Sequence, residues 1–428
     1  MQRLGLEHDL LVEAARAALE GARETIGAGG TPPKPEAVLQ DAVARAQAFV
    51  NPHLVPVINA TGVVIHTNLG RAPLHPAAVN AVLGYSNLEY DLERGRRGSR
   101  RQHVERLICD LARSEAALVV NNNAAAVMLM LAALAPDKEV LISRSELVEI
   151  GGSFRVPEIM AASGARLKEV GTTNRTYASD YEAAIGPETA AILKVHRSNF
   201  RVTGFTHEAT SAELVAVGRR HGLMTLYDLG SAAFLPLPAA LHTETMVTDE
   251  LQVGMDVVSF SGDKVLGGPQ AGILVGSRDA IERLAHHPMA RALRVDKMTL
   301  AALQTTLLAC REGRPEQIPV LAMLHASQDD LMQRAKALAD ELGGDFEACE
   351  VEDAVGGGSH PDETLPGAGL VLSLPSDGAL ARAAAALRMG DPPVIAVVHD
   401  HRLWIHLRTV SPGEEEALVK RLRALVSA

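Results

Sequence analysis

Cysteine, long apolar runs and positive charge are all scarce in this 428-residue sequence. The three cysteines, Cys109, Cys310 and Cys349, lie far apart and lack the spacing of a metal site. Each is therefore expected to be a small buried apolar residue, and no metal is expected. The longest purely apolar run covers only residues 124–135, whereas a membrane-spanning helix needs about 20 residues. The run predicts a buried helix and no membrane segment.

The charge balance excludes another class of protein. The N-terminus has no charged-then-apolar signal pattern, so the protein is expected in the cytoplasm. A net charge of −11 argues against a DNA-binding protein or a generic nucleic-acid binder, because phosphate contacts need clustered lysine and arginine. The exception is the segment 94–101, which holds Arg94, Arg96, Arg97, Arg100 and Arg101. This segment is either an anion-binding site or a solvated or subunit-facing surface.

Residues 1–54 are expected to form a helical N-terminal arm. Apolar residues recur at spacings of three and four over residues 7–26, which is typical of an amphipathic helix. A linker rich in glycine and proline at 27–35 leads into a second predicted helix over 35–50.

Residues 55–300 are expected to form one large α/β domain. Short apolar runs alternate there with helical segments, at 117–120, 140–143, 165–170, 190–196, 223–227, 256–260 and 273–275. Strands that alternate with helices indicate a mainly parallel sheet covered on both faces. The sequence therefore predicts a mainly parallel seven-stranded sheet.

Residues 301–428 are expected to form a smaller α+β domain. Helical stretches at 298–310 and 318–342 lead into apolar runs at 369–374, 394–398 and 403–407. The last two runs flank a predicted hairpin turn at 399–402, and a final helix begins near residue 413.

Three motifs in the large domain carry candidate chemistry. At 121–123 an apolar strand breaks at three asparagines and restarts as an alanine-rich helix, which is either a phosphate site or a plain capped helix. Asp228 ends an apolar strand, where open α/β sheets place ligands; it binds a cationic ring nitrogen or only caps the next turn. Lys264 follows a strand in a loop of small residues, as a Schiff-base lysine or an ordinary surface lysine.

The order of these motifs is more specific than any one of them. Pyridoxal 5'-phosphate is held by a phosphate cradle, an aspartate at the pyridine nitrogen and a Schiff-base lysine. The chain presents candidates for all three in that order. The sequence therefore predicts a pyridoxal phosphate enzyme.

Long stretches of the chain also resemble a known family. They lie at 57–71, 85–93, 97–100, 119–126, 169–174, 194–196, 198–199 and 261–270. These stretches resemble bacterial selenocysteine synthase, the L-seryl-tRNA(Sec) selenium transferase family, which has the aspartate aminotransferase fold (fold type I). The likeness is dense over residues 55–300 and looser beyond.

The resemblance implies a role for each candidate site residue. Lys264 would be the catalytic Schiff-base lysine and Asp228 the partner of the pyridine nitrogen. The further cofactor contacts implied are Asn121, Asn122, Asn123, Ala124, Ser261 and His196, with Ser99 and Arg100 reaching a cofactor across a dimer interface. Arg71, Arg291 and Arg294 match positions that hold the anionic selenium donor. The spacing of Arg291 and Arg294 places both on one side of a predicted helix, where they are otherwise a surface pair.

The implied reaction converts seryl-tRNA(Sec) to selenocysteinyl-tRNA(Sec). Water leaves by β-elimination to give an aminoacrylyl intermediate, and selenophosphate then supplies selenium. His66 and His196 are either proton carriers or ordinary structural histidines. The alternative is a pyridoxal-phosphate-dependent β-eliminating lyase acting on a small amino acid or amino sugar acid. The resemblance further implies a homo-oligomer built from dimers, in a ring such as a decamer.

The sequence departs from the family pattern at three places. Family members carry a longer helical region at the N-terminus that contacts tRNA, so the arm of this chain is expected to be short. Arg197 stands where a small residue is expected, and Phe200 where tyrosine is common.

Overall fold

The computed structural model describes residues 6–78, 84–150, 154–241, 246–356 and 363–426. The chain divides into two compact units, Met1–Val57 and Ile58–Ala428. The first unit consists of α1 (His8–Gly27) and α2 (Pro35–Ala48), which pack through Leu11, Ala14 and Ala46. Both helices of the predicted arm are thus confirmed, and Pro35 begins α2 as expected.

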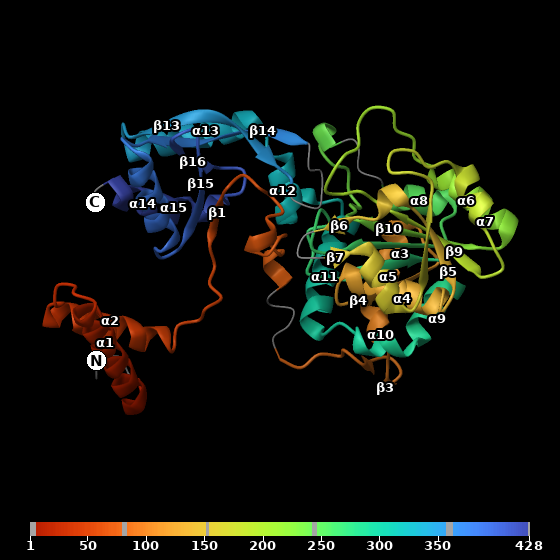
Figure 1. Cartoon of the computed structure of the whole chain (residues 1–428), viewed down its shortest axis with the longest axis horizontal. Coiled ribbons are helices and arrows are strands. Elements are labelled where there is room, and N and C mark those ends of the chain that lie inside the picture. Colours follow the sequence, from red (N-terminus) through yellow and green to blue (C-terminus); the bar gives the residue numbers. More distant parts are fainter. Residues whose placement is uncertain (1–5, 79–83, 151–153, 242–245, 357–362, 427–428) are drawn as a thin grey trace. The chain divides into compact units, whose positions relative to one another are not determined.

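A seven-stranded sheet forms the larger layer of the second unit (Figure 1). Its strands, in spatial order, are β4 (Ala116–Val120), β12 (Gly272–Gly276), β11 (Val257–Ser261), β10 (Met224–Gly230), β9 (Thr189–Val195), β5 (Glu139–Ser143) and β8 (Arg166–Val170). All neighbours are parallel except β12, which is antiparallel to both β11 and β4. Every one of the seven predicted runs is a strand of this sheet.

Helices cover both faces of the sheet because successive side chains of each strand point to opposite sides. Leu118 faces a core shared with α4 (Asn123–Leu134), α5 (Val156–Ser163) and α9 (Arg278–His286). Val119 faces a core shared with α3 (Glu105–Ala112), α8 (Val247–Val253) and α11 (Lys297–Arg311). The predicted buried helix is confirmed as α4, in which Leu129, Met130 and Leu131 are fully buried.

A second sheet of five strands is covered by helices on one face. Its spatial order is β1 (Ile58–Ala60), β15 (Val394–His399), β16 (Arg402–His406), β14 (Thr364–Ser373) and β13 (Phe346–Ala354). The helices that share its core are α13 (Gln328–Leu342), α14 (Asp377–Arg388) and α15 (Glu415–Val426). Sequence reasoning missed β1, which has only three residues, and β13, whose many carboxylates hide its apolar positions.

Turn chemistry explains two further outcomes. The predicted hairpin turn between β15 and β16 is confirmed, and Asp400 and His401 both adopt positive φ, as two-residue hairpin turns require. The single helical stretch predicted over 318–342 is instead α12 (Pro319–His325) and α13. The chain breaks there because the Ser327 side chain caps α13, accepting a hydrogen bond from the Asp330 amide.

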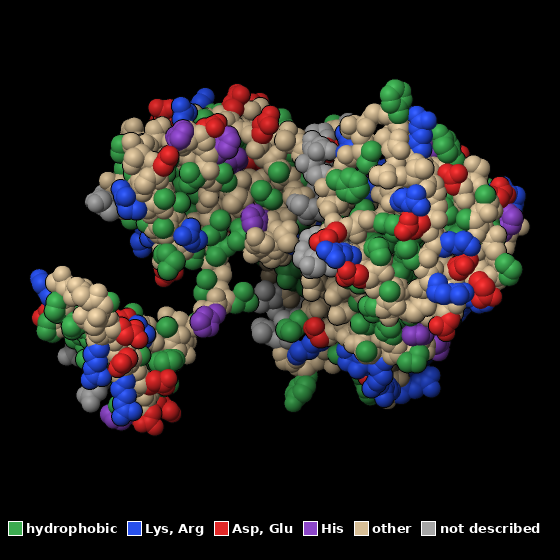
Figure 2. Space-filling model, viewed as in Figure 1, with side chains coloured by type: hydrophobic (Ala, Val, Ile, Leu, Met, Phe, Trp, Pro, Cys, Tyr) green, Lys and Arg blue, Asp and Glu red, His purple; other side chains and the backbone are tan. Residues whose placement is uncertain are grey.

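The arginine segment forms a small hairpin beside the large sheet. Strand β2 (Tyr90–Asp91) pairs with β3 (Arg96–Arg97), and a 3-10 turn, η5 (Arg100–His103), follows. Figure 2 shows basic side chains gathered at the edge of the molecule where Figure 1 places β3. In the parts of the chain that the structure describes, no helix combines the length and the apolar character needed to cross a membrane.

Candidate active site

The carboxyl ends of β10 and β11 bring Asp228 and Lys264 together. Asp228 lies on β10 and is 3% exposed, and Lys264 follows β11 and is 7% exposed. Gly230 adopts a φ of 73°, and a Cβ atom built on it would stand 4.0 Å from Lys264 Nζ. The turn after Asp228 therefore passes close to the lysine amine, and its positive φ favours glycine at this position.

Asp228 is a buried carboxylate that accepts hydrogen bonds from neutral groups of Asn123, Ser259 and the Gly230 backbone. Asn123 Nδ2 donates to Asp228 Oδ1 at 2.8 Å. Burial raises the pKa of the Asp228 carboxyl above its ordinary value, while the hydrogen bond from Asn123 and the charge of Lys264 act in the opposite direction. Such a group gains from a cationic partner, because a positive charge nearby favours the ionised form.

The asparagine motif forms the N-terminus of α4, next to Asp228. Asn122 is the N-cap residue, and its side chain accepts a hydrogen bond from the Ala125 amide at 2.8 Å. The Asn121 amide donates to Leu293 O at 3.1 Å. Helix geometry leaves the amides of Asn123 and Ala124 without intrahelical acceptors. These two free amides and the helix dipole favour an anion at the N-terminus of α4.

Arg71 contacts the residue that precedes the lysine. Its Nη1 is 2.9 Å from Oδ2 of Asp263, the residue before Lys264. Asp263 is buried, whereas the Arg71 side chain is one-third exposed. Sequence reasoning did not single out Asp263, although it stands inside the lysine motif.

Arg291 and Arg294 lie in a separate cavity of about 510 Å³ with Ser99 and Arg100. The prediction that one helix carries both arginines is wrong: α10 (Pro288–Ala292) ends before Arg294, which bridges to Val120. Ser99 caps η5, accepting from the Arg101 amide.

One carboxylate in this cavity was not anticipated. Glu89 accepts hydrogen bonds from Arg97, Arg100 and Arg294 at 3.0, 2.7 and 2.8 Å. Hydrogen bonding to Arg100 is the largest influence that lowers the pKa of the Glu89 carboxyl. Because Arg294 lies 205 positions along the chain from Glu89, no local sequence pattern predicts this pairing.

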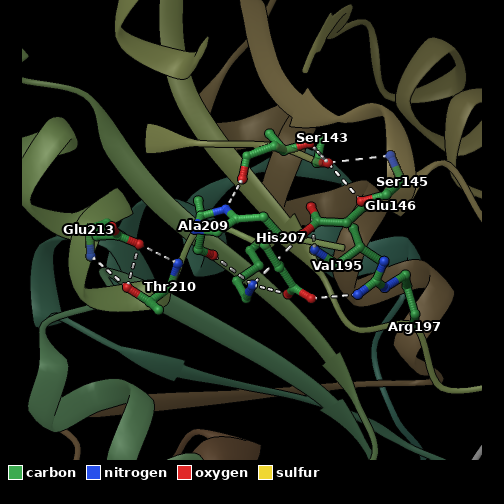
Figure 3. Close-up of polar contacts among 12 residues, drawn as sticks. Ser143, Ser145, Glu146, Val195, Arg197, His207, Ala209, Thr210 and Glu213 are labelled. Carbon is green, nitrogen blue, oxygen red and sulfur yellow. Dashed lines mark hydrogen bonds and ion pairs between the residues drawn. The ribbon is translucent and has the colours of Figure 1, made fainter. Parts of the chain in front are cut away.

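A partly buried ionic cluster lies at the end of β9, the strand next to β10, and Figure 3 shows its polar contacts. Lys194 contacts Glu208, its Nζ lies 3.8 Å from Glu146 Oε1, and Arg197 Nη2 lies 2.6 Å from Glu208 Oε2. Glu146 accepts from the Val195 amide at 3.2 Å. Val195 is the register partner of Asp228, so the cluster fixes the strand end next to the site.

The two glutamates of this cluster respond in opposite ways. Burial raises the pKa of Glu146 to about 7, against the lowering effect of Lys194. Burial also acts to raise the pKa of Glu208, but the charges of Lys194 and Arg197 prevail and lower it. Arg197, which replaces the small residue expected here, thus has a carboxylate partner.

The remaining predicted residues lie at strand ends or in the segment that leads to Arg71. Ser261 is buried at the end of β11, and the His196 amide donates to Asp228 O at 2.9 Å. His66 is the N-cap residue of the short 3-10 helix Thr67–Leu69, and its carbonyl accepts a hydrogen bond from the Arg71 amide. Within the described chain, Asn123 Oδ1, Ser231 Oγ, Ser198 Oγ and His66 Nδ1 are buried without a hydrogen-bond partner.

These features fit pyridoxal phosphate. A buried aspartate suits its ring nitrogen, a neighbouring lysine suits its aldehyde, and a helix N-terminus suits its phosphate. Asn123, whose Nδ2 donates to Asp228, also has a buried Oδ1 without a hydrogen-bond partner. The described residues contain no group of three or more histidines, cysteines or carboxylates placed to hold a metal ion.

Comparison with known proteins gives a consistent result. A family model described as L-seryl-tRNA selenium transferase matches residues 57–411. The L-seryl-tRNA(Sec) selenium transferase of Moorella thermoacetica is 49% identical over 435 residues, which cover 98% of this chain and 92% of that protein. The one from Geobacter metallireducens is 46% identical over 437 residues, covering 97% and 93%.

A solved structure shares the fold. D-glucosaminate-6-phosphate ammonia-lyase superposes with a TM-score of 0.59 at 19% identity, over 87% of this chain and 96% of that chain. At this identity the likeness concerns the fold alone. It confirms the predicted fold class, that of the type I pyridoxal phosphate enzymes.

Proposed function

The chain belongs to the L-seryl-tRNA selenium transferase family, and from that premise we propose how its residues carry out the reaction. The enzyme converts seryl-tRNA(Sec) to selenocysteinyl-tRNA(Sec) with pyridoxal phosphate as cofactor. The observation that carries the residue assignment is the buried group of Asp228, Asn123 and Lys264 where β10, α4 and the loop after β11 meet.

The cofactor is held from three sides. Asp228 keeps the ring nitrogen protonated, and the nitrogen's charge in turn stabilises the buried carboxylate. The first amides of α4, on Asn123 and Ala124, hold the phosphate. Ser261 and His196 lie at the neighbouring strand ends. When bound, the cofactor supplies an electron-accepting ring that stabilises negative charge on the serine Cα.

Lys264 has two tasks in this proposal. Its amine would hold the cofactor through the cofactor aldehyde, and the same amine would be the base once the substrate is bound. Lys264 Nζ then removes the serine Cα proton as a general base. The ion pair of Asp263 with Arg71 fixes the backbone just before the lysine and keeps a guanidinium beside it.

The selenium donor is proposed to be selenophosphate, held by Arg71, Arg291 and Arg294. Forked guanidinium donors suit its tetrahedral oxyanion. Within one chain Arg71 lies at the lysine, whereas Arg291 and Arg294 line the cavity with Ser99 and Arg100. A dimer that lays this cavity against the partner's lysine completes the set. We therefore propose a dimer as the catalytic unit, with dimers associating into a larger ring.

The other partners follow from the substrate. The helical unit Met1–Val57 is proposed to contact the tRNA. Residues 55–300 and 301–428 are proposed as the large and small catalytic domains, except that β1 (Ile58–Ala60) belongs to the sheet of the small domain. The cytoplasm is the proposed compartment, which agrees with three cysteines that form no disulfide in the described chain.

A spectroscopic titration tests this function. The purified enzyme, loaded with pyridoxal phosphate, is titrated with seryl-tRNA(Sec) while the Schiff-base absorption band is followed. We expect the band to shift with seryl-tRNA(Sec) and to stay unchanged with free serine or seryl-tRNA(Ser). Selenophosphate should then yield selenocysteinyl-tRNA. The matched Lys264→Ala variant should lack the Schiff-base band. A band that responds to free serine but not to seryl-tRNA(Sec) would overturn the proposal.

A further inference from the structure

One carboxylate holds three arginines in the donor cavity. Glu89 Oε1 accepts from Arg100 Nε and Arg294 Nη1, and Glu89 Oε2 accepts from Arg97 Nη2. The three guanidinium groups come from β3, η5 and the segment after α10. Their convergence on one two-oxygen anion is the arrangement by which arginines bind a phosphate-like oxyanion.

The arginines outnumber the available carboxylate. Arg291 lines the same cavity, and among the described residues it makes no ion pair with a carboxylate. Glu89 is thus the one carboxylate that the three guanidinium groups share, and Arg291 adds a fourth cation to the lining, since Glu105, the other carboxylate lining the cavity, is paired with Arg101. A cluster with this excess of positive charge favours an anion that carries more charge than one carboxylate.

Part of the cluster is held in place independently of Glu89. Arg100 Nη1 also donates to Val295 O at 2.6 Å, so this side chain keeps an anchor when the carboxylate moves. The Glu89 side chain is only about one-quarter exposed, whereas Arg97 is three-quarters exposed. Glu89 therefore lies inside the cluster, unlike the carboxylate of an ordinary surface ion pair.

We propose that Glu89 is an internal counter-anion that occupies the arginine cluster until the oxyanion of the selenium donor takes its place. This inference rests on the proposed donor site at Arg291 and Arg294. A carboxylate presents one charge and two oxygens, whereas a phosphate-like dianion presents two charges and three oxygens. The dianion therefore displaces Glu89, while singly charged anions compete with it poorly. Glu89 sets the selectivity of the site for doubly charged tetrahedral anions.

Anion binding to the holoenzyme tests the proposal without measuring turnover. Inorganic phosphate is titrated calorimetrically into the enzyme loaded with pyridoxal phosphate. The Glu89→Gln variant, which is nearly isosteric but uncharged, should bind phosphate with a Kd about tenfold lower than that of the wild type. Its binding should also weaken more steeply as sodium chloride is added, because chloride then meets no internal competitor.

Two variants separate charge from structure. Glu89→Asp keeps the charge and should bind phosphate like the wild type. Glu105→Gln removes the other carboxylate that lines the cavity. Arg101, the partner of Glu105, then still keeps its ion pair with Glu282 at 3.0 Å. The phosphate affinity of the Glu105→Gln variant should stay within about twofold of wild type. If Glu89 only holds the loop in shape, Glu89→Gln will bind phosphate more weakly, and the inference is wrong.

The remaining outcomes distinguish the two proposals. If wild type and Glu89→Gln bind phosphate equally, the donor site stands but Glu89 is not its counter-anion. If neither binds phosphate, the assignment of Arg291 and Arg294 to the donor fails, and this inference fails with it.

Discussion

Asn123 Nδ2 donates a hydrogen bond of 2.8 Å to Asp228 Oδ1, so the first residue of α4 contacts the carboxylate at the end of β10. Two motifs that lie 105 positions apart in the sequence form one buried unit. A hydrogen bond therefore joins the residue at the proposed phosphate site to the residue at the proposed ring-nitrogen site.

Removing this link should weaken cofactor binding. Asn123→Ala leaves Asp228 with one donor fewer and raises its pKa further, which disfavours the charged form that the ring nitrogen needs. We expect the Kd for pyridoxal phosphate to rise about tenfold, since a hydrogen bond to a charged group contributes about 1.5–3 kcal/mol. Absorbance titration of the apoenzyme measures the change. Asn51→Ala, at an exposed asparagine outside the site, is the control; equal losses in both variants would contradict the argument.

The ion pair at the lysine should show coupling in a double-mutant cycle. Arg71→Ala leaves the buried Asp263 without its partner. The variant should unfold at a lower Tm, because its free energy of unfolding falls by about 1–3 kcal/mol. Asp263→Asn in the same background removes the unpaired charge and should restore part of the loss. Thermal unfolding of the four proteins tests this, and strictly additive effects would show that the two side chains do not interact.

The Glu146 carboxyl should make stability depend on pH. Its pKa of about 7 lies above the usual value near 4.5, so the folded state retains the proton that the unfolded state loses. The stabilisation it gives is fully present at low pH and is lost as pH rises through 7. Glu146→Gln mimics the protonated form. Relative to wild type it should therefore gain up to about 3 kcal/mol between pH 4 and pH 8.

Glu208→Gln supplies the opposite case. The lowered pKa of Glu208 means that its ionised form stabilises the fold, and this contribution is lost as pH falls through the folded pKa. Its Tm should lie below that of wild type at neutral pH and approach it in acid. Tm profiles of both variants against pH decide the matter; parallel profiles would refute the assigned charge states.

The helical unit should be removable. Residues 8–48 pack through their own small core, and β1 begins only at Ile58. A chain that starts at Ile58 should keep the Schiff-base band and lose affinity for seryl-tRNA(Sec). Absorbance and a filter-binding assay measure the two properties. A truncated chain that binds seryl-tRNA(Sec) as tightly as the full chain would place the tRNA contact elsewhere.

Local patterns were sufficient to predict much of the fold. The seven β-rich runs, the buried α4 and the hairpin turn at 399–402 each follow from spacing or turn chemistry within a short segment. Strand β1 has only three residues and pairs with a strand near the other end of the chain, so no window around it contains its partner. The break at Ser327 depends on one capping hydrogen bond.

The same distinction applies to the site. Asp228 and Lys264 stand out because each ends a buried strand. The contacts of Asn123 with Asp228, and of Glu89 with Arg294, are set by which strands and loops the fold brings together. Glu146 was missed because a lone glutamate after a strand resembles any solvated loop residue, and only its burial reveals it.

The parallel pairing of β1 with β15 also has a consequence for synthesis of the protein. Residues 58–60 leave the ribosome early, and their partners at 394–396 leave near the end of translation. The seven strands of the large sheet emerge between these two events and are free to assemble first. The growing chain therefore holds β1 without a partner until its last segments appear, and a chain that ends before residue 394 lacks both β15 and β16, the two strands that lie between β1 and β14.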